Sequence, residues 1–173
     1  APLPPAPAPL AEPGQRDWLP ATLWKGLAHP RVWLTYALRC LLLDRKAYRH
    51  VTRDRYMTGP ALLIVLASLA VSVVRYGSFN PLFVLGSAVL WFLGTLVVYT
   101  AGHLLARQGT FTRTFRALGF AQTTALLELF ALYPPIALVV RAVALLVRVL
   151  ALWMAAATAH DLKGARAAVL PVV

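Results

Sequence analysis

Glu128 and Arg148 are the ionisable residues whose positions within apolar sequence could carry chemistry. The run from 117 to 159 contains only Glu128, Arg141 and Arg148 as charged residues. This run is about twice as long as one membrane span needs, so it must fold back on itself. Folding near Leu138 places Glu128 and Arg148 each ten residues from the bend, at matching depth on antiparallel helices. We therefore predict a Glu128–Arg148 ion pair, because charges at membrane depth are costly unless they are paired.

This intramembrane pair has two interpretations. A small transporter or channel could use it as a proton or ion relay. A structural pair would instead fix the register of two helices. Glu128 is the only acid within a predicted span, and no second relay group accompanies it. The sequence therefore favours the structural interpretation.

Two histidines are the candidate cofactor ligands. His103 ends one predicted span and His160 ends another, on the same side of the membrane. Facing imidazoles could ligate a haem, and one alone could ligate the magnesium of a chlorophyll-type pigment. The alternative is a pair of solvated interfacial histidines. Neither residue stands in a specific ligand motif, so we expect no cofactor, although a bound lipid is compatible with the sequence.

Small residues recur at helical spacing along three of the predicted spans. Such residues let helix backbones approach closely in a membrane, so we interpret them as helix-packing positions. The glycines are spaced eight residues apart, and the alanines lie on the same faces as Glu128 and Arg148: Gly86, Gly94, Gly102, Ala121, Ala125, Ala151 and Ala155.

The sequence contains no recognisable enzyme motif. It lacks a Gly-rich phosphate loop, a His-Glu zinc motif, a serine nucleophile elbow and paired carboxylates. With only 6 Asp and Glu residues, acid–base catalysis has few candidate groups. Cys40 is the single cysteine, which excludes an intramolecular disulfide and a cysteine metal cluster. We predict a protein that is not an enzyme.

The elements that must position these residues are membrane helices. The chain of 173 residues is 60% hydrophobic and 13% charged, with a mean hydropathy of +0.68. This composition lies outside that of ordinary soluble domains and predicts an all-α integral membrane bundle. Within a membrane domain over 57–173, we expect four spans and a truncated fifth, over 58–74, 82–105, 117–133, 138–159 and the stub 167–173.

Two further regions precede the membrane domain. Residues 1–20 contain seven prolines and predict an extended tail. Residues 21–56 predict cytoplasmic helices that lie in the head-group layer, over 21–28 and 31–44, followed by a basic run over 45–55. These helices are too short to cross the hydrocarbon, and Trp, Tyr and basic residues surround them.

The basic residues predict the orientation. Of the 17 Lys and Arg residues, fourteen lie on the side that holds the N-terminal region, and Arg75 and Arg141 lie on the other. The positive-inside rule therefore places the N-terminus in the cytoplasm. These basic residues form a belt that flanks the predicted spans. Such a belt predicts contact with anionic lipid and no nucleic-acid binding. The preference for Arg over Lys is typical of a bacterial protein, which indicates a bacterial cytoplasmic (inner) membrane.

Three segments resemble the YIP-domain family of polytopic membrane proteins, in its bacterial branch. Residues 22–31 (TLWKGLAHPR) resemble the family's entry helix, 114–121 (TFRALGFA) its central R-x-L-G-[YF]-A motif, and 159–167 (AHDLKGARA) its late A-H-x-L segment. Their order and spacing fit over about 21–170. The resemblance implies a cytoplasmic N-terminal region and five spans. Eukaryotic relatives interact with Rab-type GTPases in vesicle traffic, whereas bacterial members mostly lack an assigned activity.

These observations predict a non-catalytic membrane subunit, or scaffold or accessory protein, of a larger complex. Its expected partners are other integral membrane protein subunits and anionic lipid. The alternatives are a small transporter or channel that uses Glu128 and Arg148, and a haem-bearing or chlorophyll-bearing subunit of an electron-transfer or light-harvesting complex that uses His103 or His160.

Overall fold

A computed structural model describes residues 18–76, 80–107 and 109–162 of the chain. Every regular element in these ranges is a helix, which confirms the predicted all-α class. In chain order they are α1 (Pro20–Leu27), α2 (Pro30–Leu41), α3 (Arg45–Arg53), η1 (Arg55–Met57), α4 (Thr58–Tyr76), α5 (Pro81–Ala106), α6 (Phe111–Ala121), η2 (Gln122–Leu132), η3 (Pro134–Ile136) and α7 (Ala137–Ala159), where η denotes a 3₁₀ helix.

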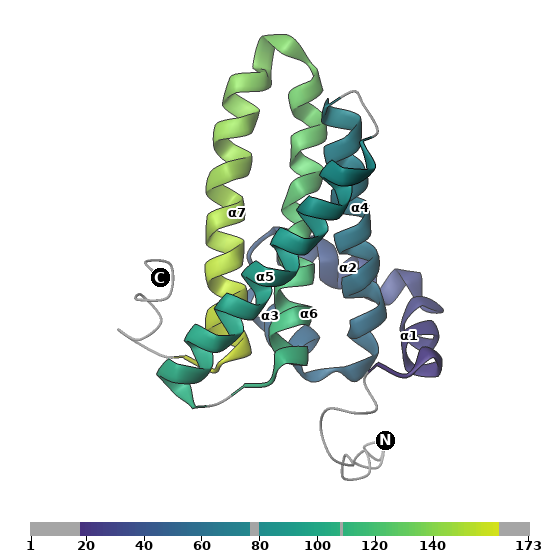
Figure 1. The fold of residues 1–173 in the computed structure, drawn as a ribbon, viewed down its shortest axis with the longest axis vertical. Helices are drawn as coiled ribbons and strands as arrows, with labels where there is room; N and C mark the ends of the chain where they lie inside the picture. The colour runs from purple at the N-terminus through teal and green to yellow at the C-terminus, as the bar shows by residue number, and fades with distance from the viewer. Residues whose placement is uncertain (1–17, 77–79, 108, 163–173) are drawn as a thin grey trace, which may run out of the picture.

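The three short helices α1 to α3 gather at one end of the molecule, and the long helices extend away from them (Figure 1). Pro20 and Pro30 open α1 and α2, where a missing amide proton costs nothing. The basic run 45–55 is more ordered than the sequence indicated, because it forms α3 and η1. Asp44 caps α3 by accepting a hydrogen bond from the Lys46 amide at 2.8 Å.

Within the described residues, three helical segments are long and apolar enough to cross a membrane. They are Arg55–Val74, Pro81–Leu105 and Pro134–Ala159. These segments correspond to the predicted spans over 58–74, 82–105 and 138–159. The most apolar window of Arg55–Val74 is 50% buried within the chain, whereas the windows of α5 and α7 are largely exposed, with 6% and 11% buried. Such surfaces suit contact with lipid or with other membrane helices.

The predicted span over 117–133 takes a different form, and it is not among the three long apolar helices. The α-helix of α6 ends at Ala121 and the 3₁₀ helix η2 continues its course beside α7 (Figure 1). At the change, the hydroxyls of Thr123 and Thr124 each donate at 2.8 Å to the backbone carbonyl three residues earlier. Local bonds of this kind compete with α-helical bonding. Pro134 and Pro135 follow at the turn, a few residues before the predicted bend near Leu138.

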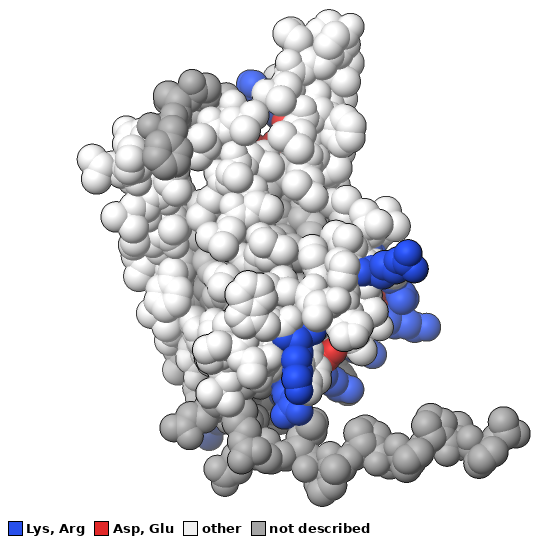
Figure 2. Space-filling model, turned by 90° about the vertical axis from the view of Figure 1, so that its right-hand side faces the viewer, with Lys and Arg blue, Asp and Glu red and all other residues white. Residues whose placement is uncertain are grey.

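The buried core lies near the end that carries the short helices. Its members come from α2, α3, α4, α6 and α7, and include Tyr48, Val51, Ala61, Phe120 and Ala155, each without exposed surface. Lys and Arg also gather toward this end, while the rest of the visible face is mostly uncharged (Figure 2). We call the compactly packed end that carries α1 to α3 the basic end. We call the apolar part formed by the long helices that extend away from it the shaft.

Candidate functional site

The structure brings Glu128 of η2 and Arg148 of α7 together. Arg148 Nη1 lies 3.4 Å from Glu128 Oε1, and Arg148 Nη2 donates to Gln122 Oε1 at 3.1 Å. The Arg148 side chain is 39% exposed and that of Glu128 is 19% exposed. The contact between the charges is longer than the 2.7–2.9 Å typical of strong charge-assisted bonds. The sequence did not indicate that Gln122 is a partner.

A cavity of about 410 Å³ lies beside this pair, between α4, α5, η2 and α7. Its wall combines apolar side chains with six polar ones: Ser68, Ser72, Ser87, Gln122, Glu128 and Arg148. The sequence did not indicate that Ser68, Ser72 and Ser87 share a site, because isolated serines are common in apolar helices. Only the folding of four segments around one space shows that they share a site.

The alanines of the predicted packing faces lie inside the helix bundle. Ala121, Ala151 and Ala155 are fully buried and belong to the common core, and Ala125 is 5% exposed. Because their side chains are small, α7 can approach α6 and η2 closely. This close approach keeps Glu128 and Arg148 within reach of each other.

The predicted glycine stripe of α5 divides into two parts. A Cβ atom added at Gly86 or Gly94 would meet nothing within 4 Å in the described chain. At Gly102, by contrast, an added Cβ would overlap the imidazole ring of His160. Gly102 therefore packs within the chain, whereas packing of Gly86 and Gly94 against a partner stays a prediction.

His160 is a buried residue that joins three segments. Its side chain is 1% exposed, and its Nε2 lies 3.2 Å from the Thr114 hydroxyl oxygen. An added Cβ at Gly109, where φ is +97°, would come within 2.6 Å of its Nδ1. The ring thus fills the space where α5, the connector before α6 and the end of α7 meet. The interpretation of His160 as a solvated interfacial residue is wrong.

His103 differs from His160 in its exposure. It is exposed on α5, with its ring centroid 5.8 Å from that of Tyr99. Tyr99 in turn lies 6.3 Å from the His160 ring. Ligation of a haem or a chlorophyll-type pigment by His103 or His160 stays a prediction. Among the described residues, no group of three or more His, Cys, Asp and Glu side chains is placed to hold a metal ion.

Arg116 forms a polar clamp that the sequence did not reveal. Its side chain is 3% exposed; Nε donates to the Thr58 hydroxyl at 2.8 Å and Nη1 to the Thr52 carbonyl at 3.2 Å. Thr52 lies in the last turn of α3, where backbone carbonyls lack helical partners and favour a cation. Arg116 thereby joins α6 to α3 and to the start of α4. In the sequence it counted as a basic residue and as the arginine of the motif over 114–121, without an indication of its partners.

Glycines allow close backbone contacts of α6 with α4, and of α1 with η1 and α4. A Cβ added at Gly119 of α6 would lie 2.9 Å from the Ala61 Cβ. A Cβ at Gly26 of α1 would overlap the Tyr56 carbonyl, and one at Gly59 would overlap the Leu23 carbonyl. These backbones touch because no side chain separates them. The segment 114–121 therefore serves to dock α6.

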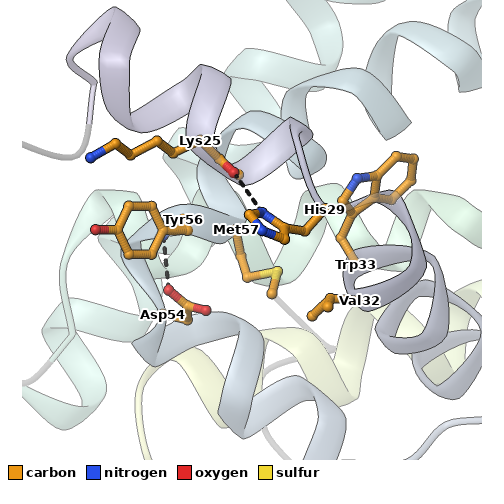
Figure 3. A pocket seen from close by; sticks show the side chains of 8 residues that line it. Lys25, His29, Val32, Trp33, Asp54, Tyr56 and Met57 are labelled. Carbon is orange, nitrogen blue, oxygen red and sulfur yellow. Dashed lines mark hydrogen bonds between the residues drawn. The ribbon is translucent and has the colours of Figure 1, made fainter. Parts of the chain in front are cut away.

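A second cavity, of about 380 Å³, lies between α1, α2 and η1 (Figure 3). Val32 and Trp33 line it from α2, Lys25 from α1, and Tyr56 and Met57 from η1. Two hydrogen bonds hold its edge, from the Tyr56 amide to Asp54 Oδ1 at 2.9 Å and between His29 Nδ1 and the Lys25 carbonyl at 3.4 Å. The lining is mainly apolar.

Two groups in the basic end have strongly raised pKa values because they are buried. Desolvation raises the pKa of Cys40 to about 12, and the negative charge of Asp44 adds to this effect. Desolvation also raises the pKa of Tyr48 well above its usual value. The pKa of Asp44 is lowered, first by the Lys46 amide and then by Arg39, whose Nε donates to it at 2.8 Å. Cys40 is therefore a structural thiol.

An all-helical chain with three long apolar segments and a basic end defines a helical membrane protein. The chain matches the Yip1 domain family over residues 38–173. This match covers most of its length, so the chain belongs to that family, as the motifs indicated. The first of those motifs, over 22–31, precedes the match. Comparison with curated proteins gave no match, and comparison with solved structures gave none.

Proposed function

We propose that this protein is a non-catalytic membrane subunit, or scaffold, that packs against partner proteins through its exposed helical faces. The observation that carries the proposal is the exposure of α5, of which 6% of the most apolar window is buried within the chain. Gly86 and Gly94 leave open space along this helix. Small residues of this kind admit a second helix at close range. The expected partners are other integral membrane protein subunits.

The proposed topology has the basic end in the cytoplasm and four crossings, with α6 and η2 supplying the third. The truncated fifth span over 167–173 and the extended tail over 1–17 lie outside the described residues. Leu34, Leu38 and Leu42 recur at intervals of four along α2, and all are at least 47% exposed. Such a stripe beside basic residues suits a helix in the head-group layer, in contact with anionic lipid. A bacterial cytoplasmic membrane is the proposed location.

The test is purification in a mild detergent from the native membrane, followed by identification of the bound subunits. We expect a defined complex, and replacement of Gly86 and Gly94 by Leu should release the chain from it. Replacement of Val89 by Phe on the same helix is the control, because Val89 is already 48% exposed. A chain that is purified alone and monodisperse would contradict the proposal.

A second candidate, a small transporter, is favoured by the cavity beside Glu128 and Arg148. It differs from the first in one measurement. For a transporter, Glu128→Gln should abolish solute or ion flux in proteoliposomes and leave folding intact. For a scaffold, the same substitution should reduce complex assembly and the unmodified chain should show no flux.

A further inference from the structure

The polar cavity lies within the part of the chain that is otherwise apolar. Ser68 and Ser72 come from the second half of α4, and Ser87 comes from α5. The two charged residues, Glu128 and Arg148, come from η2 and α7. Hydrocarbon cannot satisfy polar side chains, so a polar space at this depth requires water or a polar ligand. The volume of about 410 Å³ exceeds what one or two waters need.

The charges leave capacity for a ligand. The guanidinium of Arg148 is held by Gln122 on one side and by Glu128 at 3.4 Å on the other, and its side chain remains 39% exposed. Arginine presents five donors in a fixed fork that suits phosphate and carboxylate groups. Arg148 can therefore bind an anionic group in the cavity while it keeps its bond to Gln122.

The same cavity also holds groups that suit a cation. The hydroxyl of Ser68 donates to the Val65 carbonyl at 2.7 Å, and that of Ser72 donates to the Ser68 carbonyl at 3.1 Å. Each hydroxyl has thereby used its proton and keeps only acceptor capacity. Glu128, which lines the same cavity, supplies a carboxylate. Serine oxygens and a carboxylate together favour an ammonium group.

We propose that this cavity binds a zwitterionic group with a phosphate at Arg148 and an ammonium at Glu128 and the serines. A phosphate-and-ammonium compound of the phosphoethanolamine kind has this chemistry, either as a lipid head group or as the free solute. In a bilayer the lipid is the abundant source, and apolar residues on the cavity wall, such as Leu69 and Leu90, suit its acyl chains. The proposal of a ligand in this cavity does not rest on the scaffold role.

The experiment uses the whole chain and two sources of the ligand. In one arm, the protein is reconstituted in nanodiscs with phosphatidylethanolamine or phosphatidylglycerol, and retained lipid is measured by native mass spectrometry. In the other, free phosphoethanolamine is titrated in detergent and followed by the fluorescence of Trp91, which lines the cavity. Trp91→Phe identifies the part of the signal that comes from this residue.

Ser72→Leu is the decisive variant, because it fills the cavity and leaves both charges in place. Val89→Leu, on the exposed surface of α5, is its control. If Ser72→Leu does not fold, Ser87→Val replaces it. We expect the cavity variant and Arg148→Gln to weaken binding about tenfold or more, whereas Val89→Leu should not.

Each outcome has a defined meaning. Selective retention of phosphatidylethanolamine supports the lipid source, and a saturable Trp91 signal with phosphoethanolamine supports the free solute. Equal retention of both lipids by wild type and cavity variant, together with no Trp91 signal, would overturn the proposal. Loss of binding without loss of partner subunits separates this site from the scaffold function.

Discussion

The two ends of the helical bundle use polar residues in opposite ways. At the basic end, Arg116 and His160 are almost fully buried and bind partners on other helices. In the shaft, Arg148 and Glu128 are partly exposed and border a cavity. Burial with close partners fixes a structure, whereas exposed charges beside an open space can accept a ligand. The comparison indicates that the basic end holds the fold and the shaft is available for binding.

The largest expected effect concerns Cys40. Because its pKa is raised from 9.0 to about 12, its thiolate population at pH 8 should be about a thousandfold lower than in the unfolded chain. Alkylation by iodoacetamide should therefore be slower by at least that factor in the folded protein, as measured by mass spectrometry. Rapid alkylation at pH 8 would show that the basic end is open.

Arg116→Met should produce the next largest effect. It removes the charged donor to the Thr58 hydroxyl and the Thr52 carbonyl. We expect the free energy of unfolding to fall by about 3 kcal/mol or more, because hydrogen bonds to a charged group contribute about 1.5–3 kcal/mol each. Thermal unfolding in detergent measures it, with Arg113→Met on the same helix as the control. Equal midpoints for the two variants would refute the clamp.

Gly102→Ala tests the packing of His160 against α5. The added methyl group overlaps the imidazole of His160. The imidazole is held in place because it is buried and bonded to Thr114. Overpacking of this kind costs about 1–3 kcal/mol. Gly94→Ala, in open space on the same helix, should be neutral or stabilising by up to about 1 kcal/mol. The difference between their unfolding midpoints is the measurement, and a stabilising Gly102→Ala would contradict the contact.

Glu128→Gln should have the smallest effect on stability. Its contact with Arg148 is 3.4 Å long and partly exposed, and polar contacts between membrane helices contribute about 0.6 kcal/mol on average. We expect a coupling free energy of about 1 kcal/mol or less between the two side chains, measured in a double-mutant cycle with Arg148→Gln. A coupling of several kcal/mol would make this pair a main support of the fold and remove the contrast between the two ends.

Much of the shaft could be predicted from the sequence, because its signals are local. Apolar length locates the helices, and the folding back of one long apolar run brings Glu128 and Arg148 together. The turn lies at Pro134 and Pro135, however, and not near Leu138 as the equal spacing assumed. The basic end was harder, since Arg116 has the same sequence appearance as a lipid-facing arginine. Its partners, Thr52 and Thr58, lie 64 and 58 residues away. His160 was misjudged for the same reason, because the glycines that enclose its ring are distant in sequence.

The 3₁₀ form of η2 has a consequence for the register of the shaft. A 3₁₀ helix rises about 2.0 Å per residue and an α-helix about 1.5 Å, so the 11 residues of η2 reach about 5 Å further than they would as an α-helix. That difference equals about one helical turn. Glu128 is the seventh residue of η2, so if η2 rewound as an α-helix, Glu128 would move by about 3 Å along the helix axis and away from its present level with Arg148.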